Sequence, residues 1–434
     1  MLSRIRFLTY HWSRHCDCRS FHPLAGTATD KNPANEVDFN EKEIRKSIKN
    51  SNRRSCETIN LQLVTNMRLQ LYKNISDLEQ DRVQWDTLAG SFPFFQFDWM
   101  TNWFQTLGKD LELAVLVGIN NDNQWVGIAP WCIDRTQPLL NKLRFLGSGD
   151  ACSDYLSLIS REEIHREFNR IAIDWLIENI GCADTLGRID VIELEGISPN
   201  DPNAEYLCEV LTANGMKHHT TELEGGWEVE LPSTWEELNA KFSKKMRRKT
   251  KAAAKRLASV DTEVLSSVDS RYSTEQLWKM FVELHQQRRE MLGQPGCFAN
   301  TDFELFLKRA FLPMEKNNRA ELLIINFEKK PLVAAIGFKS ESTYYLYQSG
   351  MDSTRMRLEP GYQICSTAIQ RAIALGLKQF DFLRGDEPYK ARWNTTRIPI
   401  TRTRFIPKNS VANLKHSVWL TGRTLKHLVT SNRS

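Results

Sequence analysis

Three apolar runs of strand length follow one another between residues 321 and 352, and they limit the fold of this chain more than any other feature. The runs are ELLIINFE, LVAAIGFKSES and TYYLYQSGMD. Short apolar runs separated by turn residues predict an antiparallel meander. An amphipathic helix over Tyr362–Leu375, which Gly376 ends, and the strand-like run KQFDFLRG come next. Antiparallel strands that lead into one strand–helix–strand unit predict an α+β fold with mixed sheets flanked by helices.

The first half of the chain has the same order of elements. Helices precede the apolar strands LELAVLVGIN and QWVGIAPWCID. After them we expect the strands LRFLGSG and SDYLSLIS and a long helix over Glu162–Asn179. The half ends with the strand DVIELEGI, a helix over Asn203–Ala213 and the closing strand GGWEVELP. The order starts again near residue 233, and TRTRFIP is expected as the last strand of the second half. We predict a disordered extension over residues 1–60, a first domain over 61–230, a second domain over 231–408 and a basic amphipathic tail over 409–434.

The helices of the second half carry start signals. Ser233-Thr-Trp-Glu236, Ser273-Thr-Glu-Gln276 and Thr301-Asp-Phe-Glu304 all match the capping-box pattern, in which a side-chain oxygen at the first position caps the helix. A basic helix over Asn239–Leu257 is expected after the first of them.

Positive charge is concentrated in two segments, although the net charge of the chain is only +5. Residues 241–256 contain nine Lys and Arg and no acid, and residues 388–434 contain ten and no acid. Such separation indicates an anionic partner, and phosphate, nucleic acid and lipid head groups all fit. A basic helix in which Phe242 and Met246 are four residues apart fits two interpretations. It is either solvated, or it lines an interdomain cleft and grips an anionic donor or acceptor.

A candidate anion site precedes the helix that begins near Gly361. Arg355 and Arg357 flank the sequence Glu-Pro-Gly, in which Pro360 fixes the turn and Gly361 permits close backbone approach. Unpaired N–H groups and the helix dipole at such a terminus favour an anion, for example a pyrophosphate. An ordinary helix start with exposed arginines is the alternative.

These segments together resemble a known family. FDWMTNWFQTLG, WVGIAPWCI, LRFLGSG with SDYLSL, FSKKMRRKTKAAAKRL and EPGYQI…AIALGLKQFDFLRGDEPYKARW occur in an order similar to that of the CelD-type proteins associated with cellulose and exopolysaccharide biosynthesis. That family resembles the FemAB aminoacyltransferases and carries two GNAT-like domains in tandem. The resemblance covers roughly residues 61–407. Only Arg357-Leu-Glu-Pro-Gly361 matches the usual GNAT pyrophosphate loop, Gln/Arg-x-x-Gly-x-Gly/Ala.

The resemblance implies an acyltransferase in which an amine or hydroxyl attacks the thioester of acetyl-CoA, with the active site in the second domain. Lys390 matches the lysine that FemAB relatives place near the donor phosphate or leaving group, and we expect it to stabilise charge. We expect Tyr389 to act as an acid and Asp381 and Asp386 to act as bases or orienting groups. The expected cofactor-binding residues are Arg355, Arg357, Gly361, Tyr362 and Gln348. The expected substrate-binding residues are Lys245, Arg247, Arg248, Arg288, Asp154, Tyr155 and Trp393.

Two alternative functions stay open. One is FemAB-like aminoacyl transfer from charged tRNA onto a peptidoglycan precursor. The other is a non-catalytic protein whose basic helix holds RNA or an anionic glycan. No DNA partner and no metal are expected, because the sequence has no metal-ligand cluster, and its nine cysteines are scattered as in reduced cytosolic proteins. We therefore expect a cytoplasmic protein, with the basic tail as a candidate for peripheral contact with the inner face of the membrane.

Overall fold

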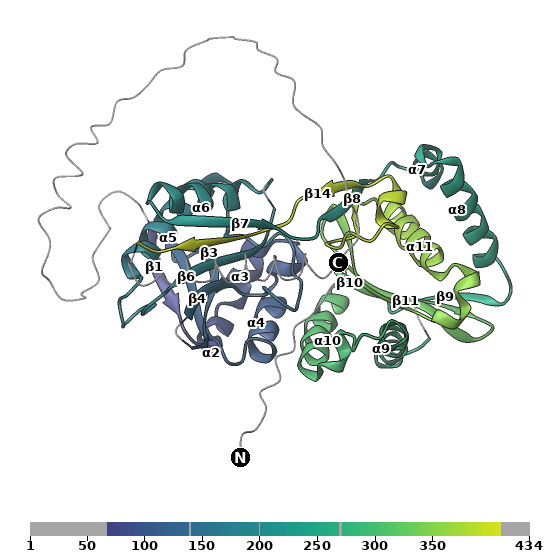
Figure 1. The fold of residues 1–434 in the computed structure, drawn as a ribbon, viewed down its shortest axis with the longest axis horizontal. Coiled ribbons are helices and arrows are strands. Elements are labelled where there is room, and N and C mark those ends of the chain that lie inside the picture. The colour runs from purple at the N-terminus through teal and green to yellow at the C-terminus, as the bar shows by residue number, and fades with distance from the viewer. Residues whose placement is uncertain (1–66, 139, 199, 269–270, 409–434) are drawn as a thin grey trace, which may run out of the picture. The chain divides into compact units, whose positions relative to one another are not determined.

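The computed structural model describes residues 67–408 except 139, 199 and 269–270. The extension expected over residues 1–60 and the tail expected over 409–434 lie outside the described residues. All described residues fall within one compact unit. Two mixed sheets with helices around them make up this unit (Figure 1), which confirms the α+β class.

The first sheet has the strand order β1-β2-β3-β4-β6-β15-β7, and β5 pairs with β3. Its strands are β1 (Met67–Tyr72), β2 (Glu112–Asn120), β3 (Trp125–Gln137), β4 (Leu140–Phe145), β5 (Ile159–Ser160), β6 (Val191–Ile197), β7 (Lys217–Glu222) and β15 (Thr401–Ile406). The helices of this half are α2 (Ile75–Glu79), α3 (Arg82–Ala89), η1 (Pro93–Phe95), α4 (Phe97–Thr106), η2 (Glu162–Ile164), α5 (His165–Asn179) and α6 (Pro202–Ala213).

The second sheet has the order β14-β8-β13-β12-β11-β10-β9. Its strands are β8 (Gly226–Glu230), β9 (Thr262–Ser266), β10 (Ala320–Phe327), β11 (Lys330–Lys339), β12 (Thr343–Met351), β13 (Gln379–Asp381) and β14 (Thr396–Ile398). The helices are α7 (Trp235–Lys241), α8 (Lys244–Leu257), α9 (Thr274–Met291), η3 (Cys297–Ala299), α10 (Thr301–Lys316), η4 (Ser353–Leu358), α11 (Pro360–Ala374) and η5 (Lys390–Trp393). The antiparallel meander β10-β11-β12 is confirmed.

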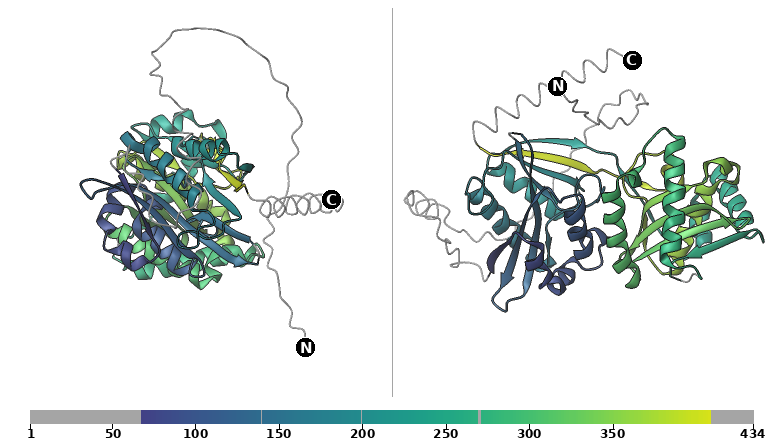
Figure 2. Two further views of the ribbon diagram at one scale, coloured as in Figure 1. Left: turned by 90° about the vertical axis from the view of Figure 1, so that its left-hand side faces the viewer. Right: turned by 90° about the horizontal axis from the view of Figure 1, so that it is seen from below.

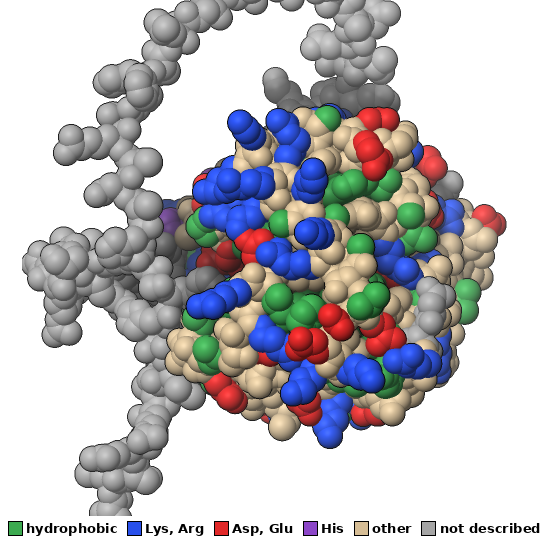
Figure 3. All heavy atoms as spheres, turned by 90° about the vertical axis from the view of Figure 1, so that its right-hand side faces the viewer, with side chains coloured by type: hydrophobic (Ala, Val, Ile, Leu, Met, Phe, Trp, Pro, Cys, Tyr) green, Lys and Arg blue, Asp and Glu red, His purple; other side chains and the backbone are tan. Residues whose placement is uncertain are grey.

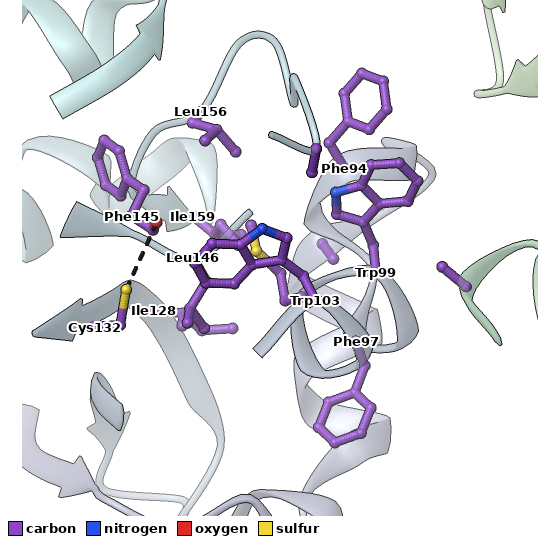
Figure 4. Close-up of a cluster of buried hydrophobic side chains, with 14 of the residues drawn as sticks. Phe94, Phe97, Trp99, Trp103, Ile128, Cys132, Phe145, Leu146, Leu156 and Ile159 are labelled. Atoms are coloured by element: carbon purple, nitrogen blue, oxygen red, sulfur yellow. Dashed lines mark hydrogen bonds between the residues drawn. The ribbon is translucent and has the colours of Figure 1, made fainter. Parts of the chain in front are cut away.

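Aromatic side chains supply much of the core of the first half. Trp99 and Trp103 of α4 are buried, as the spacing along this helix predicts. Figure 4 shows the Trp103 ring beside Leu146 and the Trp99 ring beside Phe94. The ring of Trp99 also packs edge-to-face against Phe306 and Phe338, with centroid distances of 4.8 and 5.4 Å. One hydrophobic cluster therefore includes residues of both halves.

The two sheets exchange strands, which corrects two expectations. The segment expected to close the first half, β8, pairs instead with β13 and β14 of the second sheet. The segment expected to end the second half, β15, pairs with β6 and β7 of the first sheet. Figures 1 and 2 show the yellow strand β15 running beside strands of the first half, although β14, just before it in the chain, belongs to the second sheet. The partner of a strand can lie far away in the sequence, so the order of the elements along the chain does not predict these pairings. The domain limits stay predictions.

Several local expectations also need correction. The strand expected over SDYLSLIS is limited to β5, and the residues before it form a loop in which Cys152 and Tyr155 have positive φ values of 48° and 62°. The basic helix is interrupted before Ser243, which caps α8. The caps of α7 and α10 are Thr234 and Asn300, one residue away from the expected positions. The capping box at Ser273 is confirmed.

Candidate functional site

The candidate site lies where β12 and β13 separate. The two parallel strands pair only between Thr343–Tyr345 and Gln379–Asp381. β12 then continues to Met351 against β11, and a register shift places Ile336 opposite Gln348 and Gly337 opposite Leu346. Beyond Tyr345, no described strand pairs with the β13 side of β12. Backbone groups along this edge can bind an extended polar ligand in the manner of an added strand, and bulges of this kind often lie beside active sites.

The anion site expected before α11 is only partly open. Arg355 is held by Asp352 at 2.8 Å and by the carbonyl of Phe327 at 3.2 Å, whereas Arg357 is exposed. The backbone N–H groups of Tyr362 and Gln363 donate to the Glu359 carbonyl at 3.0 and 3.3 Å. Two first-turn donors of the helix therefore already have an internal partner.

Gly361 has room around it. A Cβ atom there would meet nothing closer than Met351 Cε at 3.7 Å, which is ordinary van der Waals contact. The chain conformation therefore does not require glycine at this position. A ligand that approaches the backbone closely would require it.

A carboxylate of the chain itself occupies the start of α11. Glu359 has a left-handed conformation, with φ 56° and ψ 51°, and its side chain forms ion pairs with Lys249 and Arg256 of α8. The Arg256 pair is 3.0 Å long. Two cations of α8 are thus neutralised where the sequence predicts an anionic ligand.

A groove with a volume of about 480 Å³ lies beside this helix start. It is lined by Lys241, Phe242, Ser243, Lys245, Met246, Lys249, Tyr362, Ala391, Arg392 and Asn394. Four of these side chains are cationic and none is acidic. Arg392 Nη1 donates to the Tyr362 hydroxyl at 3.0 Å, and Lys249 Nζ lies 5.6 Å from the centre of the Tyr362 ring. The groove is therefore suited to a phosphate-bearing ligand that also has an aromatic or apolar part.

Three of the four basic residues expected to bind substrate lie on α8, and they differ in their placement. Lys245 lines the groove. Arg247 Nη1 donates to the carbonyls of Ala240 and Phe242 at 3.3 and 2.6 Å, so it holds the α7–α8 connection. Arg248 is exposed and does not line the groove.

Lys390 is buried, with 3% of its surface exposed. Its Nζ donates to the carbonyls of Leu383 and Arg384 at 3.1 and 2.7 Å and lies 3.0 Å from the Glu387 carboxylate. Two of the three ammonium donors thus serve backbone carbonyls, and the Glu387 carboxylate balances the charge. A Cβ atom at Gly385 would lie 2.8 Å from this Nζ, so the turn is built closely around the ammonium.

Tyr389 and Arg288 have environments that suit a catalytic site. Tyr389 is 37% exposed, yet burial, Cys365 and Glu387 raise its pKa well above the usual value. A tyrosine side chain that is partly exposed while its hydroxyl is shielded from bulk water is expected to lie in a recess of the protein. Arg288, which is half-buried, has a pKa lowered by burial and by Arg289. The Tyr389 hydroxyl is therefore protonated at neutral pH.

Asp381 and Asp154 form the polar junction between the two halves. Asp381 accepts hydrogen bonds from the Tyr155 hydroxyl and the Leu383 N–H, both at 2.7 Å. Burial raises the pKa of Asp381 to about 7. Asp154 is fully buried and accepts from the Arg384 N–H at 2.8 Å and from the Arg384 guanidinium. The structure thus brings Asp154 and Tyr155 next to the second half, but as partners of its buried groups.

Asp386 is fixed by Arg397, whose Nε and Nη2 lie 3.0 and 3.2 Å from its two oxygens. The Trp227 indole N–H donates to it at 3.3 Å. Hydrogen bonds from Arg397 lower the pKa of Asp386 below its usual value. A carboxylate of lowered pKa is a weak base, so this geometry suits an orienting role better than proton abstraction.

Trp393 and Gln348 complete the expected set. Trp393 is 1% exposed and packs against Phe242 and Phe382 at centroid distances of 5.8 and 6.3 Å, which gives it a place in the core. Gln348 is half-buried beside His285, whose pKa burial lowers to about 4. His285 is therefore neutral near pH 7.

Sequence reasoning missed Glu224 and Arg392. Glu224 is half-buried, and burial together with Glu387 and Asp386 raises its pKa. It precedes two glycines in a segment without a chemical spacing signal. Arg392 lies two residues after Lys390 in the second basic segment, so the charge pattern could have indicated it.

Comparison with known proteins supports a GNAT-type fold. Residues 240–391 match the family described as an acetyltransferase (GNAT) domain. The chain is similar in structure to FemX, with a TM-score of 0.55 and 14% identity over 75% of this chain and 96% of FemX. It is also similar to the C-terminal domain of a putative lysylphosphatidylglycerol synthetase from Agrobacterium fabrum (TM-score 0.46, 10% identity, 78% of this chain and 95% of that one). A tandem GNAT protein from the clavulanic acid biosynthesis pathway has a TM-score of 0.40 at 9% identity, over 78% and 98%.

No curated protein matches the chain. The family match over residues 240–391 and the likeness to FemX indicate a GNAT-type α+β fold, here with two mixed sheets flanked by helices. Among the described residues, no group of His, Cys, Asp and Glu could hold a metal ion. No described helix is long and apolar enough to cross a membrane.

Proposed function

We propose that this chain is a GNAT-type acyltransferase that transfers an acetyl or other acyl group from acetyl-CoA to an amine or hydroxyl, and that its second half carries the active site. The observation that carries the proposal is the groove beside the start of α11, which is lined by four cationic side chains and no acidic one. The phosphates of the donor would bind Lys245 and Arg392, which have no acidic partner among the described residues. The pantetheine arm would then pair with the open edge of β12.

The reaction needs a proton acceptor, a stabilised oxyanion and a proton for the leaving thiolate. The acceptor nitrogen or oxygen attacks the thioester carbonyl carbon, and the carbon–sulfur bond breaks. We assign the thiolate proton to Tyr389, whose raised pKa keeps it protonated. We assign the proton acceptor to Asp381, reached through the Tyr155 hydroxyl that donates to it. Lys390 keeps the turn after β13 in place for both groups.

The acceptor class rests on resemblance. The CelD-type resemblance suggests a small molecule, a sugar or a cell-envelope precursor, with cellulose or exopolysaccharide biosynthesis as the setting. Of the residues expected to bind the acceptor, we keep Arg288 at the reaction centre, because Arg288 and Tyr389 interact electrostatically. Asp154 and Trp393 are buried, so we assign them to support of the site.

Calorimetric titration of acetyl-CoA into the purified protein tests the proposal. We expect binding by the wild type and at least tenfold weaker binding by the double variant Lys245→Glu, Arg392→Glu, because two attractive charges become repulsive. Lys329→Glu with Lys330→Glu is the matched control, since both side chains are exposed and distant in sequence from the groove. Absence of acetyl-CoA binding by a folded wild type would contradict the proposal, as would unchanged affinity of the groove variant.

A second candidate is aminoacyl transfer like that of FemAB proteins, with charged tRNA as donor and a peptidoglycan precursor as acceptor. Glu359 favours it, because its carboxylate occupies the place where a CoA pyrophosphate is expected and neutralises Lys249 and Arg256. Binding of aminoacyl-tRNA without binding of acetyl-CoA would favour this candidate. Binding of RNA or anionic glycan with no transfer would indicate the non-catalytic alternative.

A further inference from the structure

The outer face of α8 carries a stripe of cations that the donor groove does not use. Lys244, Arg248, Lys251 and Lys255 are all exposed, and none lines the groove. At about 100° per residue they fall within an arc of about 60°, and they extend over about 16 Å of the helix. We call these four side chains the α8 stripe. The buried residues of the helix, Met246, Thr250 and Ala253, lie on the opposite face.

Nothing in the described part of the chain neutralises the α8 stripe. The acid paired with α8 there is Glu359, and its partners are Lys249 and Arg256 on the inner flank. The first turn of α8 contains no acid, so its cations oppose the helix dipole. Lys244 and Arg248, like Lys251 and Lys255, are like charges four residues apart, which further disfavours the helix. Figure 3 shows the Lys and Arg side chains gathered on the side where α8 lies in Figure 1. An external anionic surface would offset these repulsions.

Neighbouring side chains favour a lipid surface over RNA. Val260 is fully exposed in the turn after the C-terminal end of α8, where it can enter the headgroup boundary of a bilayer. Tyr389 is the one aromatic residue among the exposed large hydrophobic side chains of the described residues, and it does not belong to α8. The stripe therefore offers bases no ring to stack on.

We propose that the α8 stripe docks this protein on an anionic bilayer, with α8 parallel to the surface. Lys or Arg side chains near such a surface strengthen binding by about fivefold each. This places Lys245, Lys249 and the donor groove on the flank of the docked helix. An acceptor held at the membrane would then reach the site without leaving the surface.

Flotation of the full chain with vesicles tests the proposal. Vesicles of 30% phosphatidylglycerol and 70% phosphatidylcholine are compared with pure phosphatidylcholine at 100 mM salt. We expect binding to the anionic vesicles alone. The variant Lys244→Gln, Arg248→Gln, Lys251→Gln, Lys255→Gln should lose about 600-fold in partition coefficient, from about fivefold for each cation. Val260→Ser should lose a few-fold.

A matched variant changes charge by the same amount elsewhere. Arg166→Gln, Arg309→Gln, Lys316→Gln, Lys330→Gln neutralises four exposed cations that lie outside α8. It should bind anionic vesicles within twofold of the wild type. Circular dichroism confirms that each variant is folded. Equal losses in both quadruple variants, or an unaffected stripe variant, would overturn the proposal. Absence of vesicle binding by the wild type would overturn it too, and salt-dependent binding of a 30-nucleotide RNA lost in the stripe variant would then identify RNA as the partner.

Discussion

Two sets of cations in this protein have opposite surroundings. At the junction of the two halves, Arg384 contacts Asp154 and Glu195, and Arg402 donates to Glu195 at 2.8 Å. On α8 and in the donor groove, Lys245, Arg392 and the α8 stripe have no acidic partner among the described residues. The net charge of the chain counts both sets of cations equally, but only the unpaired cations of α8 and the groove are available to an external anion.

The difference separates structure from function. Paired, buried charges fix the two halves against each other, and removal of one partner leaves the other uncompensated. Open charges contribute little to folding and can be changed at small cost. The predictions below test this division, first where the expected change in stability is largest.

Asp154→Ala should give the largest loss of stability. It leaves the Arg384 guanidinium and N–H without their buried carboxylate, which costs about 3–5 kcal/mol. Urea denaturation measures the free energy of unfolding. Asp150→Ala, at an exposed position in the same loop, is the control and should change it by less than about 0.5 kcal/mol. Similar values for the two variants would show that the junction charges are as dispensable as the open ones.

Lys390→Ala should lose both activity and stability. The sequence alone suggests that this change abolishes transfer and leaves the fold intact. The structure adds a loss of about 2–3 kcal/mol, because two buried carbonyls lose their donor and Glu387 loses its cationic partner. Lys378→Ala, an exposed lysine before β13, is the control. If the Lys390→Ala protein has wild-type stability and no turnover, the role of Lys390 is direct stabilisation of charge in the reaction and not support of the turn.

Asp381 should give a smaller effect that depends on pH. Its folded pKa of about 7 lies above the unfolded value of about 3.9. Between these values the folded state binds more protons, so its contribution to stability falls as pH rises, by up to about 1.4 kcal/mol per unit. Asp381→Asn should remove this slope between pH 5 and 7.

Asp386→Asn is the control of opposite sign. The pKa of Asp386 is lowered, so its contribution is present above the unfolded pKa and is lost as pH falls below about 4. Its pH dependence should therefore match that of the wild type between pH 5 and 7. An Asp381→Asn protein with the wild-type slope would show that Asp381 does not titrate in this range.

Local patterns predicted most elements of the fold, because helix periodicity, strand runs and caps depend on neighbouring residues. The meander β10–β12 and the capping box at Ser273 are examples. The exchange of β8 and β15 between the sheets was not predictable, since alternation of apolar residues indicates a strand and not its partner.

The site shows the same limit. The basic segment and the family resemblance indicated Lys245 and Tyr362, and both line the groove. The sequence could not indicate that the Lys390 ammonium donates to the carbonyls of Leu383 and Arg384 in its own turn. It also could not indicate that the Tyr155 hydroxyl donates to Asp381, which is 226 residues away. These contacts follow from tertiary packing alone.

Hydrogen–deuterium exchange with and without acetyl-CoA tests most directly whether the open cations of the groove hold the donor. Slower exchange is expected in peptides that cover residues 241–249, 360–364 and 391–394 and along the β12 segment 346–351, with little change in the first half. Protection confined to other regions, or no protection at saturating acetyl-CoA, would contradict the account.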